Sequence, residues 1–408
     1  MEMSNAKVHL NAPSAGSCWS ILPAVSLLAL CGSLPSPAHA ASETIIGGQA
    51  AVTLHRTRSG DGTRPEFLSV TLLPGRGMNV LQITAYLPGR GEVSLMASPT
   101  LKEASELLNR TGRDRDGNES FMMGGAFLFP FANRILGPAT EDGKYVLATW
   151  NGRTIPLPAN WRGRRPAAPP QALHGYLLTA RAADLKQELL PDGMAATATY
   201  VLPAQGHWFS DNTVGIQVIL QAESITVSLK VTNTGQYEEP VGIGWHPYFL
   251  LPSRDRTRAR LHLPAHMRAA VNNADDLFPT GKLLPVKDTP FDFTSPEGAP
   301  LNGSVNDAFL HLDRTAEGYA LSRITEPDAN YGLEIAALTP RIRTILVYAP
   351  SDQPFIVVEP QFNNGDPFGD AWKGQNNGMV TVPPGGTVDW KASLRLFQPN
   401  PRSVCKNP

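Results

Sequence analysis

The sequence predicts an all-β protein in which two large sheets pack face to face, with one or two short helices. Short apolar runs recur along the chain and are separated by turn residues. The 36 Gly and 37 Pro residues are spread over the whole chain of 408 residues. Strands do not alternate with long helical patterns, so a parallel sheet is not expected. All-β domains are often long, and we therefore expect residues 41–408 to form a single β-sandwich domain.

The clearest predicted strand covers residues 225–232. Its odd-numbered residues are Ile, Val, Leu and Val, and its even-numbered residues are Thr, Ser, Lys and Thr. This period of two is typical of a strand with one buried face. Similar patterns predict strands at 67–73, 79–87, 92–95, 145–150, 154–157, 215–221, 259–263, 331–336, 344–348, 355–359 and 388–397.

One helix is predicted between residues 100 and 108. Thr100 and Glu103 have the spacing of a capping box, in which each residue satisfies a free backbone N–H near the helix start. Leu101, Ala104 and Leu108 then fall on one face. The helix is therefore expected to lie against the sandwich with this apolar face.

The first 40 residues have the features of an export signal. Lys7 precedes a mostly apolar stretch at 21–34, and Ala38-x-Ala40 supplies the small side chains that a signal peptidase requires. The apolar stretch is short for a membrane-spanning helix. We expect cleavage near Ala40 and an exported protein, periplasmic or secreted, whose mature chain has no membrane anchor.

Composition argues against several other classes of protein. The chain carries 35 basic and 36 acidic residues, so no net charge attracts nucleic acid. Cys18 and Cys31 lie in the predicted signal, which leaves Cys405 and excludes a disulfide framework or a cysteine-based metal site. His262 and His266 have a spacing that could bind metal on a helix, but Pro264 lies between them. We expect no metal and no cofactor.

Five stretches place polar residues where a strand pattern does not require them. Glu359 ends an apolar strand, and such a carboxylate is either solvated or buried with a partner. His246 lies among aromatic residues and could equally be a structural imidazole. The stretches are Asn133-Arg-Ile, Leu173-His-Gly, Trp245-His-Pro-Tyr-Phe, Asn306-Asp-Ala-Phe and Val358-Glu-Pro-Gln.

In this order the five stretches resemble the aldose 1-epimerase (galactose mutarotase) family, over roughly residues 50–398. The resemblance implies the large β-sandwich of that family and a small-molecule sugar substrate. It also implies an enzyme that interconverts the α and β anomers of free aldoses such as galactose or glucose. By the same resemblance, His246 is the general acid that protonates the ring oxygen, and Glu359 is the general base that takes the proton of the anomeric hydroxyl.

Acid–base chemistry explains why these two residue types are needed. Opening the hemiacetal ring removes a proton from one oxygen and adds a proton to another, and an imidazole and a carboxylate on opposite sides of the sugar can do both. The resemblance also implies five substrate-binding residues, with Arg134 on sugar hydroxyls, His174 near the ring oxygen and Asp307 on ring hydroxyls. These residues are Asn133, Arg134, His174, Tyr248 and Asp307.

Three departures from the family pattern lie near the expected sugar site. Trp245 stands where an asparagine usually flanks the acid, and Tyr176 replaces a second glycine after Leu-His-Gly. Many members also have a glutamine in a Thr-Gln-Pro step before the last strands, whereas this chain reads Leu338-Thr-Pro-Arg. Trp245, Tyr248 and Phe249 could form an apolar wall for the sugar or belong to the core.

Two alternative functions remain open. A β-sandwich with these residues could bind carbohydrate without catalysis, since fold does not fix function. The same fold could also act on an acidic or phosphorylated sugar, with Arg162, Arg164 and Arg165 as cationic partners.

Overall fold

The computed structural model describes residues 43–110, 114–163, 167–274 and 276–399. The predicted signal peptide lies outside these ranges, so the export prediction stays a prediction. Arg164, Arg165 and Cys405 also lie outside them. Within the described ranges, no helix has the length and apolar character needed to cross a membrane.

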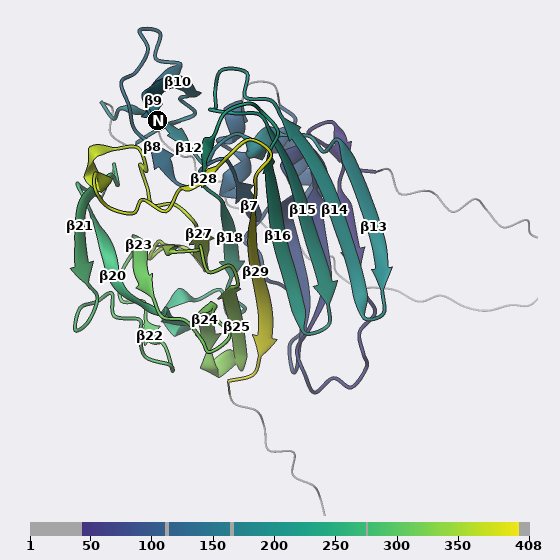
Figure 1. The fold of residues 1–408 in the computed structure, drawn as a ribbon. Helices are drawn as coiled ribbons and strands as arrows, with labels where there is room; N and C mark the ends of the chain where they lie inside the picture. The colour runs from purple at the N-terminus through teal and green to yellow at the C-terminus, as the bar shows by residue number, and fades with distance from the viewer. Residues whose placement is uncertain (1–42, 111–113, 164–166, 275, 400–408) are drawn as a thin grey trace, which may run out of the picture. The chain divides into compact units, whose positions relative to one another are not determined.

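The two largest sheets have eleven and nine strands, and every strand pairing in them is antiparallel. Figure 1 shows β13 to β16 and β29 of the nine-stranded sheet side by side. In spatial order, the eleven-stranded sheet contains β21 (Pro279–Pro285), β20 (Ala265–Val271), β23 (Val305–Leu312), β26 (Thr344–Ala349), β27 (Phe355–Gln361), β18 (Gly244–Leu250), β7 (Gly125–Leu128), β5 (Asn79–Leu87), β4 (Glu66–Leu73) and β3 (Val52–His55), with β6 (Gly91–Ser94) also paired to β5. The nine-stranded sheet contains β13 (Asp184–Leu190), β14 (Gly193–Leu202), β15 (Asn212–Gln221), β16 (Ser224–Asn233), β29 (Thr387–Phe397), β25 (Tyr331–Ala337), β24 (Ala320–Glu326), β19 (Arg260–His262) and β22 (Ala299–Pro300).

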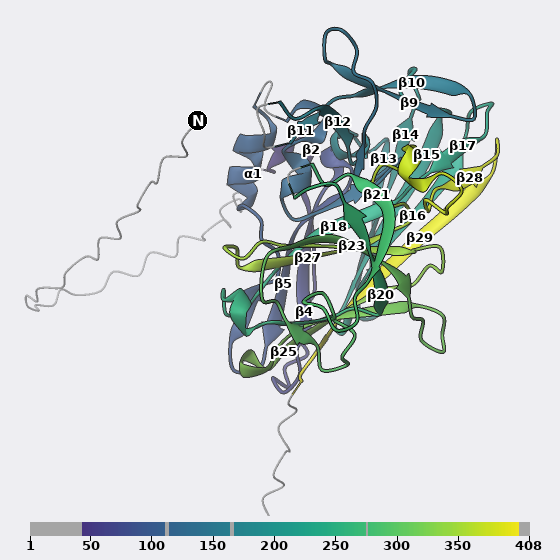
Figure 2. The same ribbon diagram turned by 90° about the vertical axis from the view of Figure 1, so that its left-hand side faces the viewer.

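Smaller elements surround these sheets, and Figure 2 shows α1 near β2. The short strands form β1 (Ile45–Ile46) with β2 (Gln49–Ala50), β9 (Tyr145–Trp150) with β10 (Arg153–Pro158), β11 (Trp161–Arg162) with β12 (Pro170–Leu173) and β8 (Arg134–Ile135), and β17 (Glu239–Val241) with β28 (Val380–Val382). The helices are α1 (Leu101–Leu108) and the 3₁₀ turns η1 (Pro74–Arg76), η2 (Arg115–Gly117), η3 (Ser120–Met122), η4 (Leu177–Thr179), η5 (Arg256–Arg258), η6 (Pro327–Ala329) and η7 (Asp370–Trp372).

The fold prediction is confirmed. Each strand predicted from the sequence is present, with ends that differ by a few residues. The helix is present too, and Thr100 and Glu103 form both hydrogen bonds of the capping box. The apolar face of α1 packs in a small cluster through Ala104 and Leu108, against Leu81 of β5.

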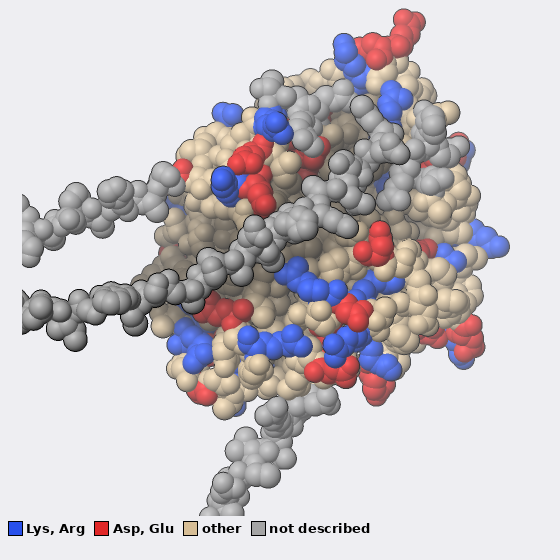
Figure 3. Space-filling model, turned by 180° about the vertical axis from the view of Figure 1, so that it is seen from behind, with Lys and Arg blue, Asp and Glu red and all other residues tan. Residues whose placement is uncertain are grey.

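One apolar core joins the two large sheets. Val70 and Ile83 of the eleven-stranded sheet belong to the same buried cluster as Ile216 and Val227 of the nine-stranded sheet. Because side chains alternate along a strand, the opposite face of the eleven-stranded sheet points away from this core, and α1 covers part of it. Acidic and basic side chains are interspersed on the face of the molecule shown in Figure 3.

Candidate active site

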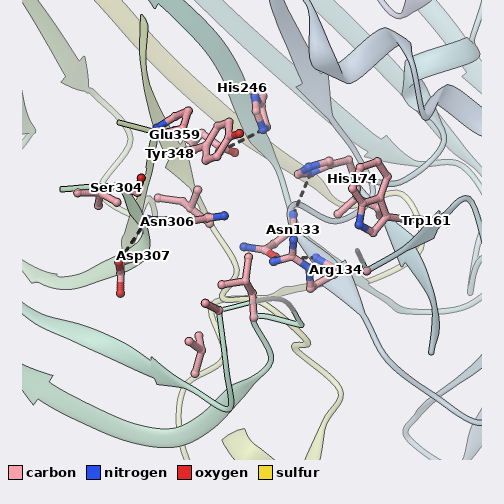
Figure 4. Close-up of a pocket in the computed structure, with 18 of the residues that line it drawn as sticks. Asn133, Arg134, Trp161, His174, His246, Ser304, Asn306, Asp307, Tyr348 and Glu359 are labelled. Carbon is pink, nitrogen blue, oxygen red and sulfur yellow. Dashed lines mark hydrogen bonds and ion pairs between the residues drawn. The ribbon is translucent and has the colours of Figure 1, made fainter. Parts of the chain in front are cut away.

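A cavity of about 930 Å³ lies on the face of the eleven-stranded sheet that is turned away from the core (Figure 4). This volume is within the range of small-molecule sites. The fold brings all seven predicted site residues to it, although they are spread over more than half of the chain. They are Asn133, Arg134, His174, His246, Tyr248, Asp307 and Glu359.

His246 and Glu359 face each other across two adjacent strands. β18 and β27 pair so that Gly244 opposes Gln361 and Tyr248 opposes Val357, which puts His246 opposite Glu359. Their side chains are almost fully buried, and His246 Nε2 lies 3.3 Å from Glu359 Oε1. The two groups therefore adjoin each other and do not lie on opposite sides of the cavity as expected from the sequence, because the pairing of β18 with β27 places them side by side. The sequence left open whether the Glu359 carboxylate is solvated or buried with a partner, and the structure shows that it is buried and contacts His246.

Burial governs the protonation of this pair. Desolvation raises the pKa of Glu359 well above its usual value, although the Gln361 amide and Arg134 act in the opposite direction. Desolvation also lowers the pKa of His246 to about 3, with Arg134 adding to the effect. Both shifts favour the neutral forms. Because the two side chains are in contact, a single proton held by the pair can reside on either residue.

Gln361 holds the carboxylate in place. Its Nε2 donates a hydrogen bond to Glu359 Oε2 at 2.7 Å, and both side chains are buried. The two residues share a strand face because they are two positions apart. Glu359 Oε2 is therefore fixed by the protein, which leaves Oε1 toward His246.

His174 and Asn133 hold each other through two hydrogen bonds, one of which is accepted by the His174 imidazole. The Asn133 N–H donates to His174 Nδ1 at 3.1 Å, and the His174 N–H donates to the Asn133 carbonyl at 2.9 Å. An accepting Nδ1 requires the neutral tautomer with its proton on Nε2. The pKa of His174 agrees with this assignment. Burial lowers it well below its usual value, and the nearby His246 and Arg134 lower it further. His174 is thus a fixed donor.

The pairing of β8 with β12 explains why these segments meet. Leu173 opposes Arg134 in this pairing, so the residues next to each of them are neighbours. Asn133 and His174 both adopt positive φ angles, 62° and 64°. Such angles are uncommon for residues other than glycine and occur at functional sites more often than elsewhere.

Arg134 is oriented by two acceptors. Its Nε donates to Gln171 Oε1 and its Nη1 donates to Asn133 Oδ1, both at 3.2 Å. Burial lowers its pKa to about 10, so the guanidinium stays charged at neutral pH. A fixed guanidinium with free N–H groups suits the binding of sugar hydroxyls.

Asp307 lines the cavity but has a partner of its own. Its Oδ1 accepts a hydrogen bond from Arg268 Nη1 at 2.7 Å. Figure 4 shows its carboxylate turned away from His246 and Glu359, whereas the Asn306 amide points into the cavity. Neighbouring residues of β23 face opposite sides of the sheet, and the geometry places Asn306 on the side of His246 and Glu359.

The aromatic residues around His246 divide between the two faces of β18. Tyr248 stacks on the His246 ring with centroids 5.0 Å apart and lines the cavity. Trp245 and Phe249 belong to the core, and the Trp245 indole donates to the Gly125 carbonyl at 3.0 Å. Of these three aromatic residues, Tyr248 lines the cavity. Trp245 and Phe249 do not, because side chains alternate along β18 and theirs point into the core.

Four further cavity residues were missed in the sequence, or given no role there. Phe121 contacts the rings of His174 and His246, and Trp161 packs edge-on against Phe121. Tyr348 and Asn306 complete the wall beside Glu359. Only Asn306 gave a signal, since it adjoins Asp307 in a polar stretch, whereas the aromatics look like core residues.

The histidines considered for metal binding lie elsewhere. His262 is on β19 and His266 is on β20, so they do not share a helix face. His262 contacts the Ser295 carbonyl and His266 contacts Asp313. Across the described ranges there is no group of three or more His, Cys, Asp or Glu that could hold a metal ion.

The fold and site together define a β-sandwich protein with a buried histidine–glutamate pair in a cavity of its larger sheet. The aldose 1-epimerase family profile matches residues 102–395, and the chain belongs to this family. The uncharacterized protein YphB of Escherichia coli K12 is 30% identical over 116 residues. That match spans 27% of this chain and 37% of YphB.

Solved structures show the same fold at low sequence identity. A galactose mutarotase-like protein from Clostridium acetobutylicum superposes with a TM-score of 0.65 at 15% identity, covering 83% of this chain and 93% of that one. An aldose epimerase homologue from C. elegans gives 0.62 at 17% identity, covering 86% and 99%. The predicted galactose mutarotase-like sandwich is therefore confirmed.

Proposed function

We propose that the protein is an aldose 1-epimerase that interconverts the α and β anomers of free aldoses, galactose and glucose being the expected class. The contact between His246 and Glu359, in a cavity that Arg134, His174 and Asn306 also line, is the observation that carries the proposal. A protein that only binds carbohydrate needs aromatic and hydroxyl-binding groups but no buried acid–base pair.

The pair supplies both proton transfers of the reaction. In the reactive form the shared proton resides on His246 and Glu359 is ionised. Glu359 takes the proton of the anomeric hydroxyl while His246 donates to the ring oxygen, so the C1–O5 bond breaks and a free aldehyde forms. Rotation about the C1–C2 bond and the reverse transfers close the ring on the other face.

The remaining cavity residues orient the sugar. Arg134 offers guanidinium donors and His174 offers its Nε2–H, and neither needs to change protonation. Tyr248 presents an aromatic face and phenol to the same cavity.

Polarimetry of freshly dissolved α-galactose and α-glucose tests this function. Wild-type protein is expected to accelerate the approach to anomeric equilibrium, and His246→Ala and Glu359→Gln are each expected to lower the rate about 10²- to 10⁴-fold. His266→Ala is the matched control, because this exposed histidine pairs with Asp313 outside the cavity. Sugar binding without any acceleration would instead identify a carbohydrate-binding protein.

An acidic or phosphorylated aldose is the second candidate substrate. Arg162 and Arg268 line the cavity in addition to Arg134, and these three cations face only two carboxylates, Asp307 and Glu359. Of these three arginines, Arg162 is exposed. If a sugar acid is preferred, Arg162→Gln will lower kcat/KM for galacturonate or glucose 6-phosphate and leave kcat/KM for galactose unchanged.

A further inference from the structure

A second cavity, of about 420 Å³, lies further along the eleven-stranded sheet. Leu310 and Leu312 of β23 contribute to it, whereas Asn306 of the same strand lines the candidate active site. Trp372 of η7, with Leu310 and Ala269, belongs to a small apolar cluster beside this cavity. The second cavity is therefore distinct from the site described above.

The charged side chains that line this cavity are arginines, and a histidine accompanies them. Arg314, Arg343 and His311 line it, and no Asp or Glu does. They come from two segments of the chain that the fold brings together. Asn364, Gln375 and Asn376 add polar amides to the same lining.

Arg314 is only partly satisfied by the protein. Its Nη2 donates to the carbonyls of Pro340 and Ile342, which fixes the guanidinium. Its Nη1 is buried and finds no acceptor among the described residues. A buried donor of this kind requires an explanation, because leaving it without an acceptor is costly.

The two guanidinium groups also repel each other. The pKa of Arg314 is lowered by burial and then by the charge of Arg343. No ion pair with a carboxylate within 4.0 Å is formed by either arginine in the described ranges. Asp313, next to Arg314 in the sequence, is engaged by His266 at 2.7 Å. An anion between the two arginines would remove this repulsion and accept from the free donor.

His311 adds a conformational observation. It adopts a φ of 55°, in the left-handed region that residues other than glycine rarely occupy. Leu310, His311 and Leu312 consequently all line the cavity, although regular alternation would turn the middle residue away. The backbone irregularity thus brings the His311 side chain to the same cavity as the two arginines.

We propose that this second cavity binds a tetrahedral oxyanion, phosphate or sulfate, free or as the ester group of a small metabolite. Arg314 and Arg343 donate hydrogen bonds to the oxyanion, since guanidinium groups match its geometry and keep their charge. His311 and the amides lie where they can contact the remainder of an ester.

Isothermal titration with inorganic phosphate, at constant ionic strength, tests the proposal directly. Wild-type protein is expected to bind at one saturable site, and Arg343→Gln is expected to weaken binding about tenfold or more, the effect of losing a charge-assisted hydrogen bond. Arg341→Gln is the matched control, because it removes the same charge from an exposed residue two positions away that does not line the cavity.

Two further variants make each outcome decisive. Arg314→Gln is expected to weaken phosphate binding as strongly as Arg343→Gln, and a thermal melt checks that it remains folded. Arg162→Gln is expected to leave phosphate binding unchanged, since Arg162 lines the other cavity. Loss of binding in Arg162→Gln alone, equal binding by all variants, or no saturable binding by wild type would overturn the proposal.

Glucose 6-phosphate and glucose, compared in the same titration, distinguish the source of the oxyanion. Tighter binding of the ester than of inorganic phosphate, lost in Arg343→Gln, identifies a phosphorylated metabolite as the ligand. Equal affinity for the two identifies a site for the free anion.

Discussion

His246 Nε2 lies 3.3 Å from Glu359 Oε1, and the register of β18 and β27 sets these residues directly opposite each other. Their protonation states are consequently coupled, and the pair must be treated as one titrating unit. The reactive arrangement that we propose, with the proton on His246, has the same number of protons as the arrangement that burial favours. The cost of reaching it is a proton transfer within the pair and no exchange with solvent.

The first prediction concerns pH. Burial raises the pKa of Glu359 and lowers that of His246 to about 3, so both shifts favour the form of the pair that carries one proton. The mutarotation rate should fall on the acid side when the pair gains a second proton. It should fall on the alkaline side when the pair loses its proton. Polarimetric kcat/KM against pH checks this, and a rate that stays constant up to strongly alkaline pH would contradict a shared proton.

The second prediction concerns Gln361, which acts on Glu359 and not on the sugar. Gln361→Leu removes the donor to Glu359 Oε2, so the pKa of Glu359 rises further. The plateau rate should fall about tenfold, as expected for one hydrogen bond to a charged group, and the alkaline limb should move to higher pH. Gln217→Leu removes an amide contact to Thr197 on the other sheet and is the control. A lower rate with an unmoved pH profile would indicate a purely structural role.

The third prediction separates two adjacent residues of β23. The Asn306 amide points into the cavity, whereas the Asp307 carboxylate accepts from Arg268. Asn306→Ala should therefore raise KM for the aldose about tenfold, the effect of one lost hydrogen bond, and Asp307→Asn should raise it less. Steady-state polarimetry provides both values. The reverse order would assign the sugar contact to Asp307, as the family resemblance implies.

The fourth prediction concerns the two faces of β18. Trp245 is fully buried in the core and donates to the Gly125 carbonyl. Trp245→Ala should lower the free energy of unfolding by about 3–5 kcal/mol, because a large core side chain and its hydrogen bond are lost. Tyr248→Phe should leave stability nearly unchanged and raise KM, since Tyr248 lines the cavity. Denaturant unfolding and polarimetry on both variants test this assignment of Trp245 to the core and Tyr248 to the cavity.

The fifth prediction concerns export, which the described residues do not address. Mass spectrometry of the protein recovered from its native cells should find a chain that begins at Ala41, following the Ala38-x-Ala40 pattern. Recovery of a chain that still carries residue 1 would refute the predicted signal.

The sequence alone determined the all-β class, because alternation, turn residues and the capping box of Thr100 and Glu103 are local properties of the chain. It also predicted seven cavity residues, through polar groups in unexpected places and a family resemblance. Only the tertiary structure decided that Trp245 belongs to the core and Tyr248 to the cavity, and that Asn306 faces the site. Those outcomes depend on which face of each strand the other sheet covers. The protonation of His246 and Glu359 also came from the tertiary structure, because desolvation is a property of the packed site and not of the residues that form it.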